Sequence, residues 1–142
     1  MRLRSICGVC LLAYLAITLP VYAQAGFPLK GTWSGEWWLK PGEDHRLLLE
    51  FDWDGKTLTG LLNPGRDAVA LQKLSLEPPR GGVAEASNPW ALHFEVDIKD
   101  QTGRVEHHVV DGKLQNLGAF ARFVTGTWNA GSQKGEFKIV RN

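Results

Sequence analysis

WALHFEVDIK, residues 90–99, alternates apolar and polar side chains along its whole length. Successive side chains of a β-strand point to opposite faces, so this stretch predicts a strand with one buried and one solvated face. The buried face would carry Trp90, Leu92, Phe94, Val96 and Ile98, and the solvated face Ala91, His93, Glu95, Asp97 and Lys99.

The same alternation recurs on both sides of this stretch, in short segments separated by turn residues. Asp54-Gly55 and Asp111-Gly112 are the clearest turn signals, because both residue types tolerate a positive φ. No segment combines a 3.6-residue period with helix caps. The predicted strands cover residues 31–40, 46–53, 57–63, 68–76, 90–99, 104–110, 113–115, 119–128 and 134–141.

These segments predict an all-β fold, an antiparallel up-and-down meander of eight or nine strands in which sequence neighbours pair. A meander of this length would leave two sheet edges exposed, and closure into a small barrel removes them. We therefore expect a barrel in which the first and the late strands are neighbours.

The first 25 residues are organised differently. Two arginines precede an apolar stretch, residues 6–19, and small residues follow a proline. This is the layout of a secretory signal peptide, cut after Ala23 or Ala25. A membrane anchor is the alternative, but the stretch is shorter than the roughly 20 residues that cross a bilayer. A lipid-modified cysteine is a second alternative, although Cys7 and Cys10 lie before the end of the apolar stretch.

We therefore expect a signal peptide over residues 1–25 and a single β-barrel domain over residues 26–142, secreted or periplasmic and with no membrane segment after cleavage. Cleavage removes both cysteines and two of the 16 Lys and Arg, which leaves 14 basic against 15 acidic residues. The mature chain would then have no disulfide and no thiolate metal site. It would also lack the basic excess that nucleic-acid binding needs.

Gly31-Thr32-Trp33, near the start of the expected domain, resembles the first strand of the calycin barrels, which include lipocalins, fatty-acid-binding proteins and avidins. The resemblance implies that Trp33 plugs one end of the barrel, under an arginine from a late strand, Arg122 or Arg141. The wider pattern, with Gly126-Thr127-Trp128 repeating the tripeptide, is similar to small exported bacterial proteins of unassigned function. The chain departs from avidins because the mature part has no tyrosine, so biotin binding is not expected.

The tryptophans suggest where a ligand could bind, because all six follow the signal segment. Most fall on the predicted inner face, where they would form a packed core or line a cavity. The first hypothesis is a small apolar molecule bound inside the barrel. The alternative is a structural or protein-interaction barrel with a filled core. The candidate lumen residues are Trp33, Trp37, Trp53, Trp90, Trp128, Phe51 and Phe94.

Trp38 and Leu48 are apolar residues on the predicted outer face. If closure brings them together, they would form a partner surface or a dimer face.

His93, Glu95 and His108 are weak candidates for a metal site. A four-residue turn at 100–103 would place Glu95 opposite His108 and Asp97 opposite Glu106 on a shared outer face. The alternative is an ordinary solvated face with cross-strand ion pairs. No serine lies in a Gly-x-Ser-x-Gly motif, and no cofactor motif is present, so we expect neither enzymatic activity nor a cofactor.

Overall fold

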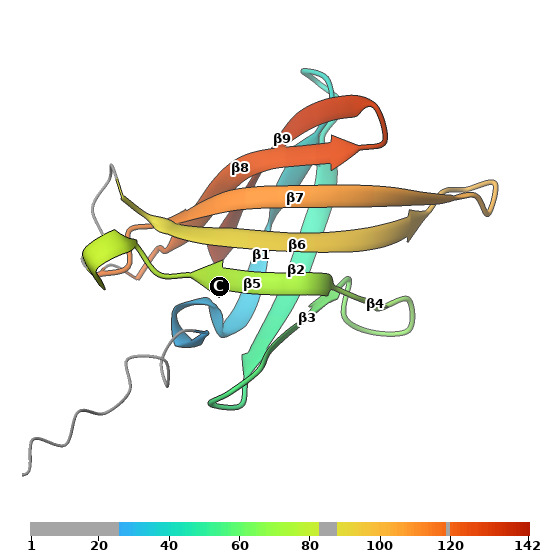
Figure 1. Ribbon diagram of the computed structural model, residues 1–142. Coiled ribbons are helices and arrows are strands. Elements are labelled where there is room, and N and C mark those ends of the chain that lie inside the picture. The colour runs from blue at the N-terminus through green and yellow to red at the C-terminus, as the bar shows by residue number, and fades with distance from the viewer. Residues whose placement is uncertain (1–25, 83–87, 119) are drawn as a thin grey trace, which may run out of the picture.

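The computed structural model describes residues 26–82, 88–118 and 120–142 (Figure 1). The expected signal peptide, residues 1–25, lies outside the described residues, as does part of the long loop expected between residues 77 and 89. The elements are η2 (Phe27–Leu29), β1 (Gly31–Trp38), β2 (His45–Trp53), β3 (Leu58–Leu62), β4 (Val69–Ala70), β5 (Gln72–Glu77), η3 (Arg80–Gly82), β6 (Trp90–Lys99), β7 (Val105–Gln115), β8 (Phe123–Ala130) and β9 (Gln133–Arg141).

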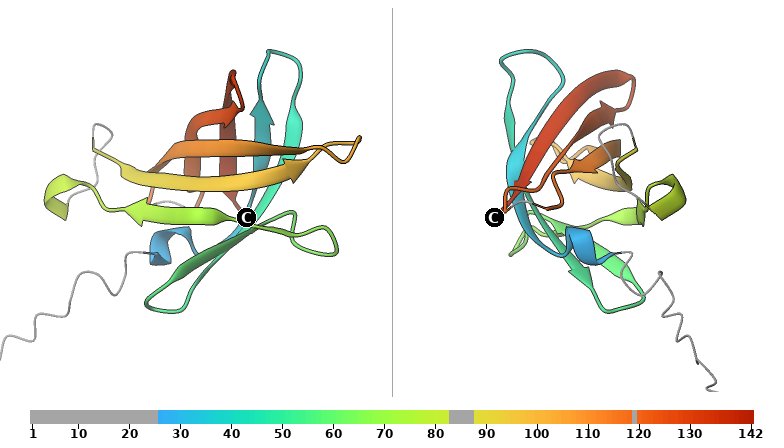
Figure 2. Two further views of the ribbon diagram at one scale, coloured as in Figure 1. Left: turned by 45° about the vertical axis from the view of Figure 1, so that its right-hand side comes forward. Right: turned by 90° about the vertical axis from the view of Figure 1, so that its left-hand side faces the viewer.

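All nine strands belong to one antiparallel sheet in the order β4-β3-β2-β1-β9-β8-β7-β6-β5. This confirms the predicted all-β meander, and the pairing of β1 with β9 confirms that the first and the last strand are neighbours. Two further views show the sheet wrapping around one interior (Figure 2). The architecture is a nearly closed barrel and is compatible with a calycin-like fold.

One segment of the chain closes most of the barrel. The predicted strand at 68–76 is split into β4, which pairs with β3, and β5, which pairs with β6. Between them the Leu71 amide donates to the Gly60 carbonyl at 2.9 Å. Lys73 has a φ of 48°, and the β5–β6 register shifts between Gln72 and Ser75. A bulge of this kind bends a strand, so one chain segment reaches both edges of the sheet.

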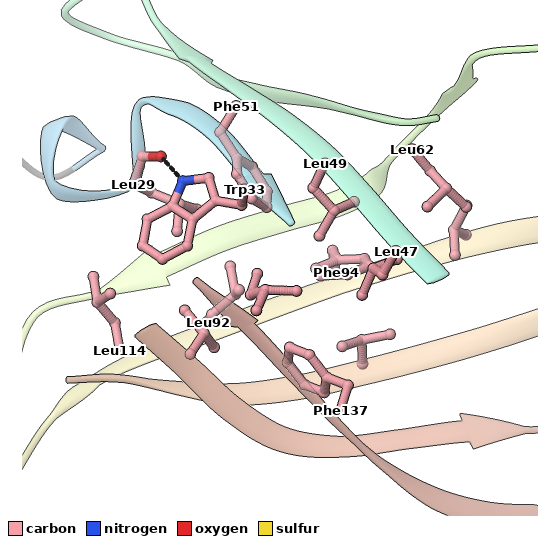
Figure 3. Close-up of a cluster of buried hydrophobic side chains, with 14 of the residues drawn as sticks. Leu29, Trp33, Leu47, Leu49, Phe51, Leu62, Leu92, Phe94, Leu114 and Phe137 are labelled. Atoms are coloured by element: carbon pink, nitrogen blue, oxygen red, sulfur yellow. Dashed lines mark hydrogen bonds between the residues drawn. The ribbon is translucent and has the colours of Figure 1, made fainter. Parts of the chain in front are cut away.

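The inner face of the sheet forms one hydrophobic core, part of which is drawn in Figure 3. Buried residues alternate with exposed ones along β2 and with half-buried ones along β6. Burial of this apolar surface is the main free-energy gain of folding. The buried core residues are Leu29, Trp33, Leu47, Leu49, Phe51, Leu62, Leu76, Leu92, Phe94, Val96, Val110, Leu114, Val124, Trp128, Phe137 and Ile139.

The two Asp-Gly dipeptides have different structures. Asp54-Gly55 forms the expected turn, with Gly55 at a φ of 96° and the Asp54 carboxylate accepting from the Lys56 amide at 2.8 Å. The turn predicted at Asp111-Gly112 is wrong, because both residues lie inside β7 and the segments expected at 104–110 and 113–115 are one strand. A glycine is required at position 112 because there is no room for a side chain: a Cβ there would lie 2.6 Å from Val124 Cγ1.

The short helix η2, which the sequence does not predict, covers one end of the barrel. The Trp33 indole nitrogen donates to the Leu29 carbonyl at 2.6 Å (Figure 3), and both side chains are fully buried. Arg122 donates to the carbonyls of Pro28 and Leu117, each at 3.1 Å. Arg122 therefore fastens η2 to the loop before β8, whereas the Arg141 side chain lies beside Gly31.

Candidate functional site

Aromatic side chains fill the interior. Four of the candidate lumen residues, Trp33, Phe51, Phe94 and Trp128, have exposed fractions of 0% or 1%. The Phe94 ring lies 5.9 Å from the Trp128 ring and 6.5 Å from the Phe51 ring, in edge-to-face contacts. Barrels of about eight strands have interiors that are either filled by their own side chains or hold one small ligand, and here buried aromatic rings occupy the interior. Three hollows on the described residues lie on the outside of the barrel or at its end.

The other three candidate lumen residues lie at the ends of the barrel and are half-buried. Trp37 stacks between Trp128, at 5.1 Å between ring centroids, and His45, at 4.4 Å. Trp53 packs so closely on Gly26 that a Cβ there would lie 2.2 Å from Trp53 Cε3. Trp90 begins β6 and packs against the core. These rings close the ends of the barrel.

His108 is buried beside Trp37 and Trp128, with an exposed fraction of 3%. The Trp128 indole donates to His108 Nδ1 at 2.8 Å, so the ring proton is on Nε2, which lies 3.5 Å from a Glu106 carboxylate oxygen. Burial lowers the pKa of His108. A neutral imidazole is the form that can accept from the indole.

The expected convergence of His93, Glu95 and His108 is wrong. The turn between β6 and β7 has five residues, 100–104, rather than the expected four. The Asp100 amide donates a hydrogen bond to the Arg104 carbonyl, and Lys99 pairs with Val105. A shift of one residue reverses the face of every side chain on a strand. His108 therefore lies opposite Val96 and points inward.

His107 takes the outer position. Its Nδ1 lies 2.6 Å from Asp97 Oδ1 and its Nε2 lies 2.9 Å from Glu95 Oε2. The hydrogen bond with Asp97, together with that to Glu95, raises the pKa of His107. The pKa values of both carboxyls are lowered, that of Glu95 chiefly by Lys73 and that of Asp97 chiefly by His107. The cluster is a network of cross-strand ion pairs, and the described residues contain no group of three ligands that could hold a metal ion.

A hollow of about 910 Å³ lies beside this cluster on the outer wall, across β5, β6, β7, β8, β9 and the end of β1. Two cross-strand rows of side chains line it, which we call the outer groove. Each row follows directly paired positions from strand to strand. The first row is Ser75, His93, Asp111, Thr127, Glu136 and Trp38, and the second is Glu77, Ala91, Lys113, Thr125 and Lys138.

Most polar side chains of the outer groove have no protein partner. His93 Nδ1 and Asp111 Oδ1 are 2.7 Å apart, and Lys138 lies over the Phe123 ring at 5.8 Å. Among the described residues, the remaining polar groups of the groove take part in no side-chain hydrogen bond or ion pair. These are Ser75, Glu77, Lys113, Thr125, Thr127 and Glu136.

Two glycines, Gly112 on β7 and Gly126 on β8, lie between the two rows of the outer groove. Gly112 pairs with Gly126, and a Cβ on Gly126 would lie 2.0 Å from the Asp111 carbonyl oxygen. Behind them, the space that a Gly112 side chain would need is occupied by Val124 and Phe137. The two glycines therefore leave no room for a side chain at either position between the rows.

The two partner-surface candidates, Trp38 and Leu48, line a second hollow of about 690 Å³ over β1, β2 and β9. Trp38 is half-buried, and Leu48 has an exposed fraction of 37%. Trp38 lies between this hollow and the outer groove and lines both. A third hollow, at the η2 end, has the fully exposed Phe120 on its rim.

The sequence alone does not mark the threonines and charged residues of β8 and β9 as site residues, because they lie at outward positions of ordinary strands. Their alignment depends on the cross-strand register, and the 100–104 turn shows that this register could not be deduced from loop length.

No protein-family model matches this chain, and no similar protein was found among the curated proteins or the solved structures. Within the described residues, no helix is long and apolar enough to cross a bilayer.

Proposed function

We propose that the protein is an exported binding module with a filled barrel as scaffold, and that it recognises its ligand on the outer face. The observation that supports this most is the contrast between the two faces. The rings of Phe51, Phe94, Trp128 and Phe137 are fully buried and contact one another. The outer groove, by contrast, presents polar side chains that have no partner among the described residues.

The first hypothesis, an apolar ligand inside the barrel, has less support. Such a ligand would have to displace core side chains such as Phe94 or Trp128, which are fully buried. Protein interiors are close-packed, and emptying space for a ligand loses the contacts that fill it. The alternative, a filled barrel with an outer partner site, agrees better with this packing.

The proposal includes no catalysis. Ser75, His93 and Asp111 lie side by side in the order of a nucleophile, a base and an acid. A nucleophilic serine needs a hydrogen bond to the base. Here the second nitrogen of His93 lies 3.8 Å from a Glu95 carboxylate oxygen, and no hydrogen bond joins it to Ser75.

A two-part titration followed by ¹⁵N NMR tests the proposal. The indole signals of Trp33 and Trp128 report on the interior and that of Trp38 on the outer face, after assignment with single Trp→Phe variants. Palmitate, retinol and haem are the apolar probes. Neutral oligosaccharides, polylysine and polyglutamate are the polar probes.

We expect a polar probe to shift the Trp38 signal and the amide signals of β6–β9 saturably, with the Trp33 and Trp128 signals unchanged. Saturable movement of the Trp33 and Trp128 signals with an apolar probe would overturn the proposal. An outer face that responds to none of the polar probes would also count against it.

A further inference from the structure

We infer that the outer groove binds a linear, uncharged oligosaccharide that lies across the strands, perpendicular to their direction. This inference rests on the proposed function, because it names the ligand class of the same outer face. It is carried by the row geometry, by the unpartnered polar groups and by the position of Trp38.

The outer groove is long enough to hold an extended chain that runs across the strands. Its first row contains one side chain from each of six neighbouring strands, from Ser75 on β5 to Trp38 on β1. Neighbouring strands are about 4.8 Å apart, so the row is roughly 24 Å long. One sugar ring of an extended glycan has a length comparable to the strand spacing. Successive rings would therefore meet successive strands, and each ring would find a new polar side chain.

The chemistry of the groove matches hydroxyl groups. A sugar hydroxyl both donates and accepts, so it can pair with carboxylates such as Glu136, with ammonium groups such as Lys113 and with the hydroxyls of Thr125 and Thr127. The groove holds three carboxylates and two lysines. This near-balance provides no strong field for a polyanion or a polycation. An uncharged polar ligand is therefore favoured.

Other extended ligands fit less well. A peptide that adds to a sheet as a new strand needs free backbone groups at an edge. The floor of the outer groove is the middle of the sheet, where β6, β7, β8 and β9 are paired on both sides. An apolar chain would bury the groove's polar groups without partners, which costs free energy.

Trp38 ends the first row, directly opposite Glu136. Trp38 is half-buried, so part of its side chain remains accessible. An amphipathic ring of this kind supplies a rigid apolar surface beside polar groups. The apolar C–H face of a sugar ring can stack on it while the hydroxyls at the ring edge reach Glu136 and Thr127.

Isothermal titration calorimetry with linear hexasaccharides, joined to the NMR readout, tests the inference. The probes are cellohexaose, xylohexaose, mannohexaose, laminarihexaose and chitohexaose. At least one should bind, more tightly than its own disaccharide and with little dependence on salt. The affected amide signals should follow both rows across β5–β9, which a contact with Trp38 alone would not produce.

The variants are Trp38→Ala and Thr127→Val, with Thr59→Val as the matched control. Thr59 is an exposed threonine on β3 that does not line the outer groove. Either groove variant should weaken binding about tenfold, the usual worth of one hydrogen bond or stacking contact, whereas the control should bind like the parent. An unchanged Trp33 indole signal verifies that each variant is folded.

The outcomes separate the inference from the proposed function. If none of the five hexasaccharides binds, or if Thr127→Val binds as tightly as Thr59→Val, the inference is overturned. If polylysine or polyglutamate then shifts the Trp38 signal, the proposed function still stands. If a hexasaccharide shifts the Trp33 and Trp128 signals instead, both are overturned.

Discussion

His107 and His108 are neighbours in sequence, yet they belong to opposite faces of the barrel. His107 lies on the outer face, bonded to two carboxylates, and its pKa is raised. His108 lies inside, accepts from the Trp128 indole, and its pKa is lowered. The strand decides which environment each imidazole has, and the environment decides which protonation state is favoured. The inner face provides stability, and the outer face is free to provide recognition.

The two faces should differ most in how much stability is lost when a side chain is truncated. Phe94→Ala should lower the free energy of unfolding by about 3–5 kcal/mol, because a fully buried aromatic ring is lost. His93→Ala, one residue away on the outer face, should cost well under half as much. Urea denaturation followed by tryptophan fluorescence measures both. Equal losses would contradict the division into a structural and a recognition face.

The second-largest loss of stability is expected at Gly126, where the neighbouring backbone leaves no room for a side chain. Gly126→Ala places a Cβ 2.0 Å from the Asp111 carbonyl oxygen, so the β7–β8 pairing must shift. Overpacking of this kind costs about 1–3 kcal/mol or more. Gly118→Ala is the matched control, because nothing lies within 4 Å of its added Cβ. Thermal unfolding should show a lower Tm for the first variant only, and unchanged stability of Gly126→Ala would disprove the steric argument.

The next loss of stability is expected at His108, whose imidazole is buried. His108→Leu leaves the Trp128 indole N–H without its acceptor, which should cost about 1–3 kcal/mol. His108→Gln can place an amide oxygen near the same point and should recover part of the loss. The measurement is again urea denaturation, at pH 7. If Leu is tolerated as well as Gln, the hydrogen bond contributes nothing to stability.

The smallest effect concerns pH and compares the two histidines directly. His107 has a raised pKa in the folded state, so its contribution is complete below about 6.5, its ordinary value, and is lost as pH rises through the folded pKa. His108 has a lowered pKa, so its contribution is complete above about 6.5 and is lost as pH falls toward the folded pKa. Stability should therefore be highest near pH 6.5.

Single variants separate these two contributions. His107→Gln should remove the decline between pH 6.5 and 8, and His108→Gln the decline between pH 6.5 and 5. The midpoint of urea denaturation at pH 5, 6.5 and 8 measures both. A parent profile that rises steadily from pH 5 to 8 would show that His107 contributes nothing.

Much of the fold could be predicted because alternation is a local property. Residues 90–99 form the predicted strand, and Asp54-Gly55 forms the predicted turn. The wrong predictions concern features that depend on contacts between distant strands, which the local alternation of side chains does not encode. Gly112 is required by the packing of Val124 and Phe137, which belong to distant strands. The split of the strand at 68–76 follows from the need to close the barrel.

The candidate site was less predictable than the fold. Trp38 and Leu48 could be placed on the outer face from alternation alone, and they do line one hollow. The outer groove requires the alignment of six strands, so an error of one residue in a single turn would scramble it. The five-residue turn at 100–104 is such a case, because its length is fixed by the Asp100 carboxylate, which accepts from the Thr102 and Arg104 amides.

β9 links the two halves of the sheet, because it pairs with β1 on one side and with β8 on the other. Until residues 133–141 have been synthesised, the strands β1–β3 and β5–β8 have no continuous sheet joining them. Contacts this distant in sequence are slow to form, and the barrel cannot be completed until β9 has been synthesised. The last strand of the meander therefore decides when the native barrel can form.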